Sequence, residues 1–221
     1  MEHTPVQGSR AVAGIRALRL VGMVGNDALG CDGAWDPWGA MECESAFRVL
    51  LGDDPYEALF KRLRLGAGDD LLGDFEQMAI WVYTTGAAFH VPINTALVTG
   101  RASEAIATVT LCLCQALQKL LPYRGYVYRG IRVPDLDAFK QRYRIGAIVT
   151  WPAFTSTSAL AAAAFVGNVN MRILSLTGRL LLYYSSQDGE AEVLFAPGLQ
   201  VEVMDWSERD GVLYLDLQER P

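Results

Sequence analysis

The hydrophobic pattern of this 221-residue chain changes near Pro122, and the change limits the fold more than any other feature. Before Pro122, capping signals introduce apolar stretches: Asp54-Pro55 opens one predicted helix and Ser103-Glu104 opens another. The uncharged stretch Gln77 to Gly100 contains proline and asparagine, so it predicts a helix, a loop and a second helix rather than a membrane span.

After Pro122, turn residues separate short runs that are rich in β-branched and aromatic residues, as in strands. Helices followed by strands are typical of an α+β fold with a mostly antiparallel sheet or sandwich. A short helix at Asp135–Tyr143 and an alanine-rich helix at Ala159–Val166 are expected between strands. The predicted strands are Tyr126–Ile131, Ile148–Thr155, Met171–Thr177, Leu180–Tyr184, Ala191–Phe195, Gln200–Asp205 and Val212–Leu217.

Length and composition indicate a single folded domain. At roughly 100–200 residues per domain, the chain forms one unit, with a helical part at 1–122 and a strand-rich part at 123–221. Apolar residues make up 51%, which excludes disorder for most of the chain. The net charge is −6, whereas nucleic-acid-binding proteins present a basic face, so we expect no nucleic-acid partner.

Two residue types that often carry catalysis or metals are scarce. The two histidines are His3 and His90, which argues against Ser-His-Asp and Cys-His catalysis. The four cysteines lack the paired spacing of zinc sites, so we expect no metal and small buried thiols. They are Cys31, Cys43, Cys112 and Cys114.

The N-terminal apolar stretch at residues 11–24 does not have the form of a cleavable signal peptide, because Arg16 and Arg19 interrupt it. We therefore expect a soluble monomer without a membrane partner. Any export would use a route that needs no standard N-terminal signal.

Three separated segments carry polar groups suited to chemistry. They are Arg129 in a predicted strand, the Ser-Thr-Ser run within Phe154–Ser158, and two glutamates within Gly189–Phe195. Taken singly, they are typical of a surface ion pair, a helix cap and solvated edge residues. Glu190 and Glu192 lie two apart in a predicted strand, so they share a face and can act on one reaction centre.

In this order and spacing, the segments resemble the R-S-E class of mono-ADP-ribosyltransferases. The resemblance rests on Tyr128-Arg129-Gly130, on Phe154–Ser158, and on a Glu-x-Glu-Val-Leu sequence followed by Pro-Gly at 190–198. Val98 stands where the family often has an arginine. Weaker matches are Ser185, Tyr83-Thr84, Ile93-Asn94 and Leu97.

The resemblance implies the ADP-ribosyltransferase fold, in which a helical N-terminal half packs on a mostly antiparallel β-sandwich. It also implies NAD+ as a substrate, with Glu192, Glu190 and Ser156 as catalytic residues. Arg172 could instead be an ordinary surface arginine, and Phe165 could instead pack in the core. The residues implied to contact NAD+ are Arg129, Gly130, Thr157, Ser158, Arg172 and Phe165.

Elementary chemistry fits these implied roles. A planar guanidinium binds pyrophosphate through two charge-assisted hydrogen bonds, which suits Arg129. Cleavage of the bond to nicotinamide builds positive charge on the ribose, and the carboxylate of Glu192 would stabilise that charge in the transition state. Ser156 would orient Glu192, and Glu190 would activate the acceptor as a general base.

The resemblance further implies transfer of one ADP-ribose to a side chain of a host protein, which the loop Ser185 to Gly189 would face. Arginine is the default acceptor and a threonine of ubiquitin is the main rival, because both need a base such as Glu190. An NAD+ glycohydrolase and a catalytically inactive partner-binding module are the rival functions. Family habit indicates a bacterial effector or toxin that acts in virulence, secreted by a non-classical route and active in the host cytoplasm.

Overall fold

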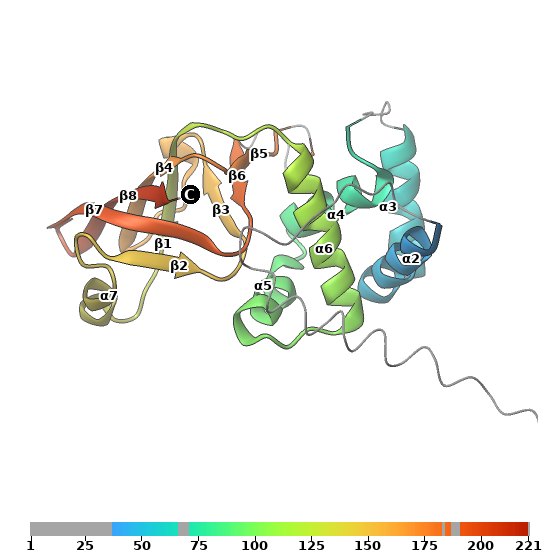
Figure 1. The fold of residues 1–221 in the computed structure, drawn as a ribbon, viewed down its shortest axis with the longest axis horizontal. Helices are drawn as coiled ribbons and strands as arrows, with labels where there is room; N and C mark the ends of the chain where they lie inside the picture. Colours follow the sequence, from blue (N-terminus) through green and yellow to red (C-terminus); the bar gives the residue numbers. More distant parts are fainter. Residues whose placement is uncertain (1–36, 66–70, 183, 187–190, 221) are drawn as a thin grey trace, which may run out of the picture.

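The computed structural model describes residues 37–65, 71–182, 184–186 and 191–220 (Figure 1). The helices are α2 (Pro37–Leu51), α3 (Asp53–Leu65), α4 (Asp74–Thr84), α5 (His90–Thr99), α6 (Glu104–Lys119) and α7 (Leu136–Arg142), with a 3-10 turn, η1, at Ala161–Ala163. The strands are β1 (Gly125–Ile131), β2 (Ile148–Trp151), β3 (Thr155–Ser158), β4 (Val169–Ser175), β5 (Arg179–Leu180), β6 (Glu192–Phe195), β7 (Leu199–Arg209) and β8 (Val212–Arg220).

The helix boundaries follow the local signals in the sequence. Ser103 caps α6, because its hydroxyl accepts a hydrogen bond from the Ile106 N–H at 3.3 Å. α5 ends at Gly100, whose φ of 68° lies in the left-handed region that glycine adopts without strain. α4 and α5 confirm the helix, loop and second helix expected within residues 77–100.

The strands form one eight-stranded sheet in the order β2-β7-β8-β4-β1-β3-β6-β5. Paired strands run antiparallel except β4 and β8, which are parallel. The sheet curves around one core, because Val149 of β2 and Phe195 of β6 come from opposite ends of the strand order and share a buried cluster. The predicted α+β class with a mostly antiparallel sandwich is confirmed.

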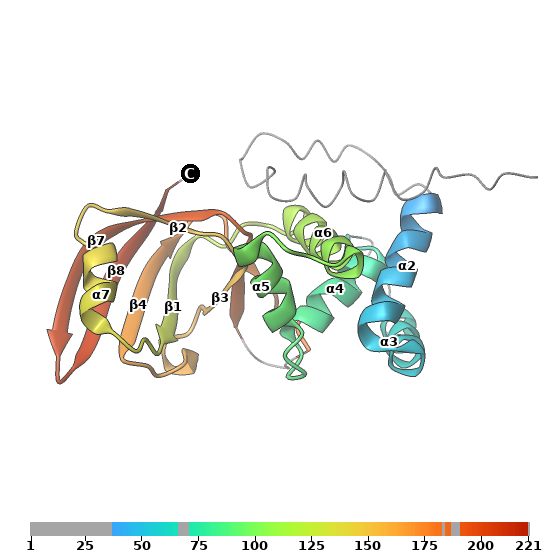
Figure 2. The ribbon, with the colours of Figure 1, turned by 90° about the horizontal axis from the view of Figure 1, so that it is seen from below.

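A second core joins the helices to the sheet. Phe154, Leu181 and Leu194 belong to the same buried cluster as side chains of α2, α4, α5 and α6. Figures 1 and 2 show α4, α5 and α6 next to β3 and β6, with α2 and α3 farther out. This packing brings the ends of α4 and α5 close to the strands that carry the predicted catalytic segments.

The cysteines behave as small buried side chains where they are described. Cys43 and Cys112 are buried with their sulfurs 3.2 Å apart, and Cys114 is partly buried. Cys31 lies outside the described residues. Cys43 on α2 and Cys112 on α6 belong to the buried helical core, and Cys114 packs against it.

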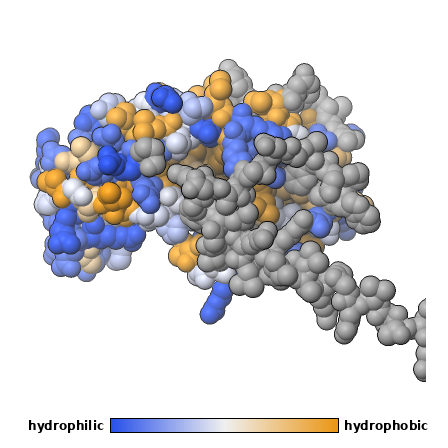
Figure 3. All heavy atoms as spheres, viewed as in Figure 1, coloured by the Kyte–Doolittle hydropathy of each residue, from blue (hydrophilic) through white to orange (hydrophobic). Residues whose placement is uncertain are grey.

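The outer face of the strand-rich part is mainly hydrophilic in the view of Figure 3, with small hydrophobic patches. Within the described ranges, no single helix is both long and apolar enough to cross a membrane. α5 and α6 meet the length and hydropathy criteria only as a pair, across a bend of 99°.

The helix predicted at Ala159–Val166 is wrong. Only Ala161–Ala163 form a 3-10 turn, and Ala164 is extended. The predicted strand at 148–155 is likewise two strands, β2 and β3, and the Ser-Thr-Ser run lies in β3. A helix this short gains little from its own hydrogen bonds, so tertiary contacts override the helix propensity of alanine.

Candidate active site

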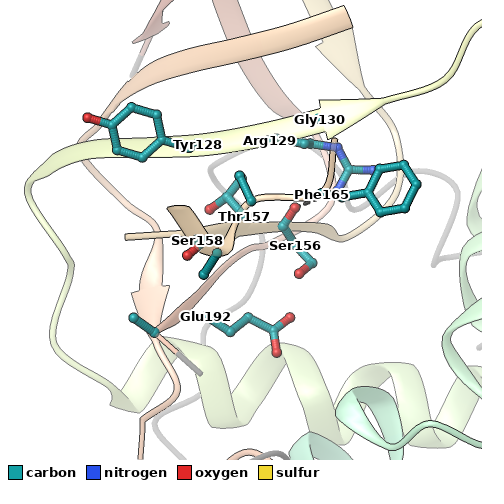
Figure 4. Close-up of a pocket in the computed structure, with 11 residues that line it drawn as sticks. Tyr128, Arg129, Gly130, Ser156, Thr157, Ser158, Phe165 and Glu192 are labelled. Carbon is teal, nitrogen blue, oxygen red and sulfur yellow. Dashed lines mark hydrogen bonds between the residues drawn. The ribbon is translucent and has the colours of Figure 1, made fainter. Parts of the chain in front are cut away.

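A pocket of about 220 Å³ lies between β1, β3, the start of β6 and the segment that follows η1 (Figure 4). It brings together seven of the nine residues that the sequence singled out as catalytic or NAD+-binding. These are Arg129, Gly130, Ser156, Thr157, Ser158, Phe165 and Glu192. Tyr128, Ala163, Ala164 and Ala191 complete the lining.

The pairing of β3 with β6 places Ser156 and Glu192 on one face of the sheet. Ser158 pairs with Glu192 and Ser156 pairs with Leu194, and side chains of paired residues and of residues two apart point to the same side. Glu192 is 9% exposed, so its carboxylate is largely shielded from water. In Figure 4 the Ser156 hydroxyl points toward this carboxylate.

Arg129 reaches the pocket from β1. Its Nη1 donates a hydrogen bond to the Ser156 carbonyl, which fixes the guanidinium beside β3. Burial lowers the pKa of Arg129 below its usual value. Within the described ranges Arg129 forms no ion pair with a carboxylate, so this partly buried cation is suited to bind an anionic ligand.

Gly130 allows the segment after η1 to lie directly on β1. A Cβ atom at Gly130 would be 1.6 Å from the Phe165 carbonyl oxygen, and one at Gly167 would be 1.9 Å from the Ile131 carbonyl oxygen. The two glycines thus permit a backbone-to-backbone approach that carries Phe165 to the pocket. Phe165 is 67% exposed, so the alternative prediction that its ring packs in the core is wrong.

The remaining two hydroxyls of the Ser-Thr-Ser run bond to nearby backbone. Thr157 is buried and donates to the Val193 carbonyl at 2.7 Å, which ties β3 to β6. The Ser158 hydroxyl accepts from the Leu160 N–H at 3.0 Å. Their side chains therefore fix the strand and the chain that leaves it, while both residues form part of the pocket wall.

One described residue that was predicted for the site, Arg172, is not among those that line the pocket. Arg172 lies on β4, where it forms two hydrogen bonds to Asp216, at 2.7 and 2.8 Å, and stacks over the Tyr126 ring. Arg172 is thus an exposed arginine with a carboxylate partner. Glu190 lies outside the described residues.

The end of α4 contacts the strand that enters the pocket. The Tyr83 hydroxyl accepts a hydrogen bond from the Asn94 side-chain amide at 3.0 Å and donates to the Phe154 carbonyl at 3.5 Å. The Tyr83 ring also contacts the Phe154 ring edge to face, at 5.3 Å between centres. Tyr83 and Asn94, which belong to the weaker matches in the sequence, are thus connected to the segment that carries the Ser-Thr-Ser run, although both are distant from it in the sequence.

Tyr83 gives a testable dependence of stability on pH. Burial raises the pKa of Tyr83 to about 12, with the Glu192 charge adding to the rise and the Asn94 hydrogen bond opposing it. Because the folded-state pKa lies above the unfolded value near 10, the unfolded chain loses this proton first. Stability should therefore fall between pH 10 and about 12, by about 2–3 kcal/mol from this group.

Urea unfolding at pH 9 and pH 11 would measure this loss. We expect Tyr83→Phe to reduce the difference in free energy of unfolding between the two pH values. Tyr214→Phe, at an exposed tyrosine on β8, is the matched control. If the free energy of unfolding differs between pH 9 and pH 11 by the same amount in Tyr83→Phe as in the wild type, the proposed effect of burial on Tyr83 is contradicted.

The family model for NAD:arginine ADP-ribosyltransferases matches residues 60–221. The chain belongs to this family. The resemblance inferred from the three sequence segments is confirmed.

Among curated relatives, the NAD(+)–protein-arginine ADP-ribosyltransferase Tre1 of Pseudomonas putida is 36% identical over 154 residues, which are 68% of this chain and 30% of that protein. Tre1 of Serratia proteamaculans is 31% identical over 153 residues, or 68% and 33% of the two chains.

This NAD:arginine ADP-ribosyltransferase family member spans a third or less of the length of these two curated relatives. Its fold also matches a solved structure, that of the type III effector XopAI from Xanthomonas axonopodis pv. citri. The TM-score is 0.73 at 19% identity, over 96% of this chain and 99% of the other. The ADP-ribosyltransferase fold expected from the sequence is confirmed.

The described part of this family member contains no group of three or more His, Cys, Asp or Glu side chains that could hold a metal ion. Ala163, Ala164 and Ala191 line the pocket but were not predicted to do so. Ala163 and Ala164 were expected within the helix at Ala159–Val166. The signal that could have found them is Gly167, which predicts a close backbone approach just after the alanines.

Proposed function

We propose that this protein cleaves NAD+ and transfers ADP-ribose to an arginine side chain of a protein. The observation that carries the proposal is the convergence of Arg129, Ser156 and Glu192 in one pocket. Membership of the NAD:arginine ADP-ribosyltransferase family and the names of the Tre1 relatives support the same donor and acceptor.

The proposed reaction is a substitution at C1′ of the ribose attached to nicotinamide. The bond from C1′ to the nicotinamide nitrogen breaks, and nicotinamide leaves with the electron pair. A guanidinium nitrogen of the acceptor forms the new bond to C1′ and gives up one proton. Glu192 stabilises the positive charge that develops on the ribose, as a shielded carboxylate does best, and Ser156 orients Glu192.

Glu190 is proposed to accept the proton from the acceptor, since a guanidinium is a poor nucleophile until a base assists it. Arg129 is proposed to bind the pyrophosphate, with Gly130, Thr157 and Ser158 forming the wall beside it. Phe165, exposed at the pocket, is proposed to stack on the nicotinamide ring.

Replacing Arg129 tests the binding of the pyrophosphate. We expect Arg129→Ala to raise the dissociation constant for NAD+ by about ten- to a hundredfold, because a charge-assisted hydrogen bond contributes about 1.5–3 kcal/mol. Calorimetric titration with NAD+ measures the change. Arg172→Ala serves as comparison, and we expect unchanged affinity because Asp216 already binds its guanidinium. Equal affinities of wild type and Arg129→Ala would remove Arg129 from this role.

Incubation with NAD+ and candidate acceptors tests the function itself. The acceptors are agmatine, an arginine-rich protein and ubiquitin. Intact mass spectrometry detects the added ADP-ribose, and peptide mapping identifies the modified residue. ADP-ribose on agmatine and on arginine supports the proposal. Modification of a ubiquitin threonine would replace arginine with the rival acceptor, and free nicotinamide without any adduct would indicate an NAD+ glycohydrolase. No NAD+ turnover would favour the inactive binding module.

We further propose that the protein is a delivered bacterial effector that acts on a protein inside a host cell, as one monomeric domain. The description of XopAI as a type III effector supports this proposal. The joint packing of helices and strands in one buried core supports only the single-domain part of this proposal. Translocation of a tagged protein into host cells, compared with an untagged control, measures delivery.

A further inference from the structure

Two cysteine side chains meet where α2 packs on α6. Cys43 lies on α2 and Cys112 on α6, and they are 69 positions apart in the sequence. Both residues are fully buried, and their sulfur atoms are 3.2 Å apart. A disulfide bond is about 2.05 Å long, so an approach of only about 1 Å separates this contact from a covalent bond.

The surrounding core keeps the two sulfur atoms close together. Phe47 on α2 and Leu113 and Ala116 on α6 belong to the same buried cluster as the two cysteines. In a close-packed interior, side chains such as these leave little room for either sulfur to turn away. Figures 1 and 2 show α2 at the outer side of the helical part, so the cysteine pair joins an outer helix to a central one.

The same burial makes the thiols slow to react once the protein is folded. The hydrogen bond with Cys43, together with burial, raises the pKa of Cys112. Because the thiolate is the form that attacks a disulfide, little of the reactive form is present in the folded protein. Oxidation should therefore occur mainly before α2 has packed on α6, while the chain is folding.

We propose that Cys43 and Cys112 are a disulfide site, which closes when the chain folds in the presence of a small-molecule disulfide and then links α2 covalently to α6. One cysteine thiolate attacks a sulfur of the reagent and displaces one thiol. The second cysteine then attacks the mixed disulfide and displaces the other thiol. The two cysteines together lose two protons and two electrons, which convert the reagent into two thiols.

Oxidative refolding of the full-length chain tests the proposal. The chain is unfolded and reduced, then refolded with oxidised and reduced glutathione, and the remaining thiols are alkylated. We expect an intact mass that shows two thiols protected from alkylation. Peptide mapping without reduction should recover one cross-linked product that joins residues 43 and 112. Protein that is already folded should form this bond at least about tenfold more slowly in the same buffer.

Thermal unfolding measures what the bond does to the fold. A cross-link between residues 69 positions apart restricts the unfolded chain, so the oxidised protein should melt roughly 5–10 °C above the reduced protein. Cys43→Ala should abolish both the cross-link and this difference. Cys114→Ala is the matched control, because Cys114 also lies on α6 but is only partly buried, and it should retain both.

The mapping of the wild-type chain is decisive even if Cys43→Ala does not fold. Alkylation of both Cys43 and Cys112 after refolding would overturn the proposal, and so would a disulfide that joins either of them to another cysteine. A cross-link without a higher melting temperature would overturn the inference that the bond strengthens the attachment of α2 to α6. None of these measurements depends on NAD+, so they remain valid whatever the outcome for the proposed function.

Discussion

Glu192→Gln should lower the rate of NAD+ cleavage by about a thousandfold, both in transfer and in hydrolysis. The substitution preserves the size of the side chain and removes the negative charge of its carboxylate. Glu192 is 9% exposed, and in such a shielded position a fixed charge acts more strongly than it would in water. Steady-state release of nicotinamide, with and without agmatine, measures the loss.

The affinity for NAD+ should change far less than the rate, because the charge is needed mainly in the transition state. Calorimetric titration of the variant separates binding from catalysis. Glu202→Gln on β7 is the control, since that glutamate pairs with Arg220 away from the pocket. Retained hydrolysis in Glu192→Gln would show that another group stabilises the ribose.

Gly130→Ala is expected to raise KM for NAD+ by at least about tenfold and to lower the melting temperature. The added Cβ would lie 1.6 Å from the Phe165 carbonyl oxygen, and backbone on both sides prevents relief by a side-chain rotation. The segment carrying Phe165 must then move off β1, which opens the wall of the pocket. Overpacking of this kind costs about 1–3 kcal/mol.

Two further glycine substitutions separate displacement of the segment that carries Phe165 from a general effect of replacing glycine. Gly167→Ala places a Cβ 1.9 Å from the Ile131 carbonyl oxygen, so it should displace the same segment from the other side. At Gly73 an added Cβ would meet nothing closer than 3.7 Å, so Gly73→Ala should leave KM unchanged. A wild-type KM in Gly130→Ala would show that the segment can shift without harm to NAD+ binding.

Features that depend on local sequence could be predicted well. Ser103 and Gly100 mark helix ends because capping is decided by a few adjacent residues. The strand assignment around Arg129 follows from the alternation of its residues, whereas the shared face of Ser156 and Glu192 depends on the pairing of β3 with β6. That most of the predicted site residues meet was predicted by the resemblance of the three segments to the family, not by these local rules.

Features that depend on distant contacts could not be predicted. Alanine favours helix, yet the chain after Ser158 is held against β1 by the space that two glycines leave. Arg172 is drawn to Asp216, which is 44 positions away and adjacent only because β4 and β8 are parallel. The contact between Thr84 and Ser186 also needs the packed arrangement of α4 against the sheet.

The parallel pairing of β8 with β4 has a consequence for the order of assembly. β8 is the last described strand in the sequence, yet it lies inside the sheet and connects the pair β2-β7 to the group that contains β4, β1, β3 and β6. During synthesis on the ribosome, the strands that border the pocket therefore remain an open half-sheet until β8 emerges. Such a topology delays closure of the curved sheet until β8 has been made, and it makes folding depend on pairing between distant segments, which is intrinsically slow.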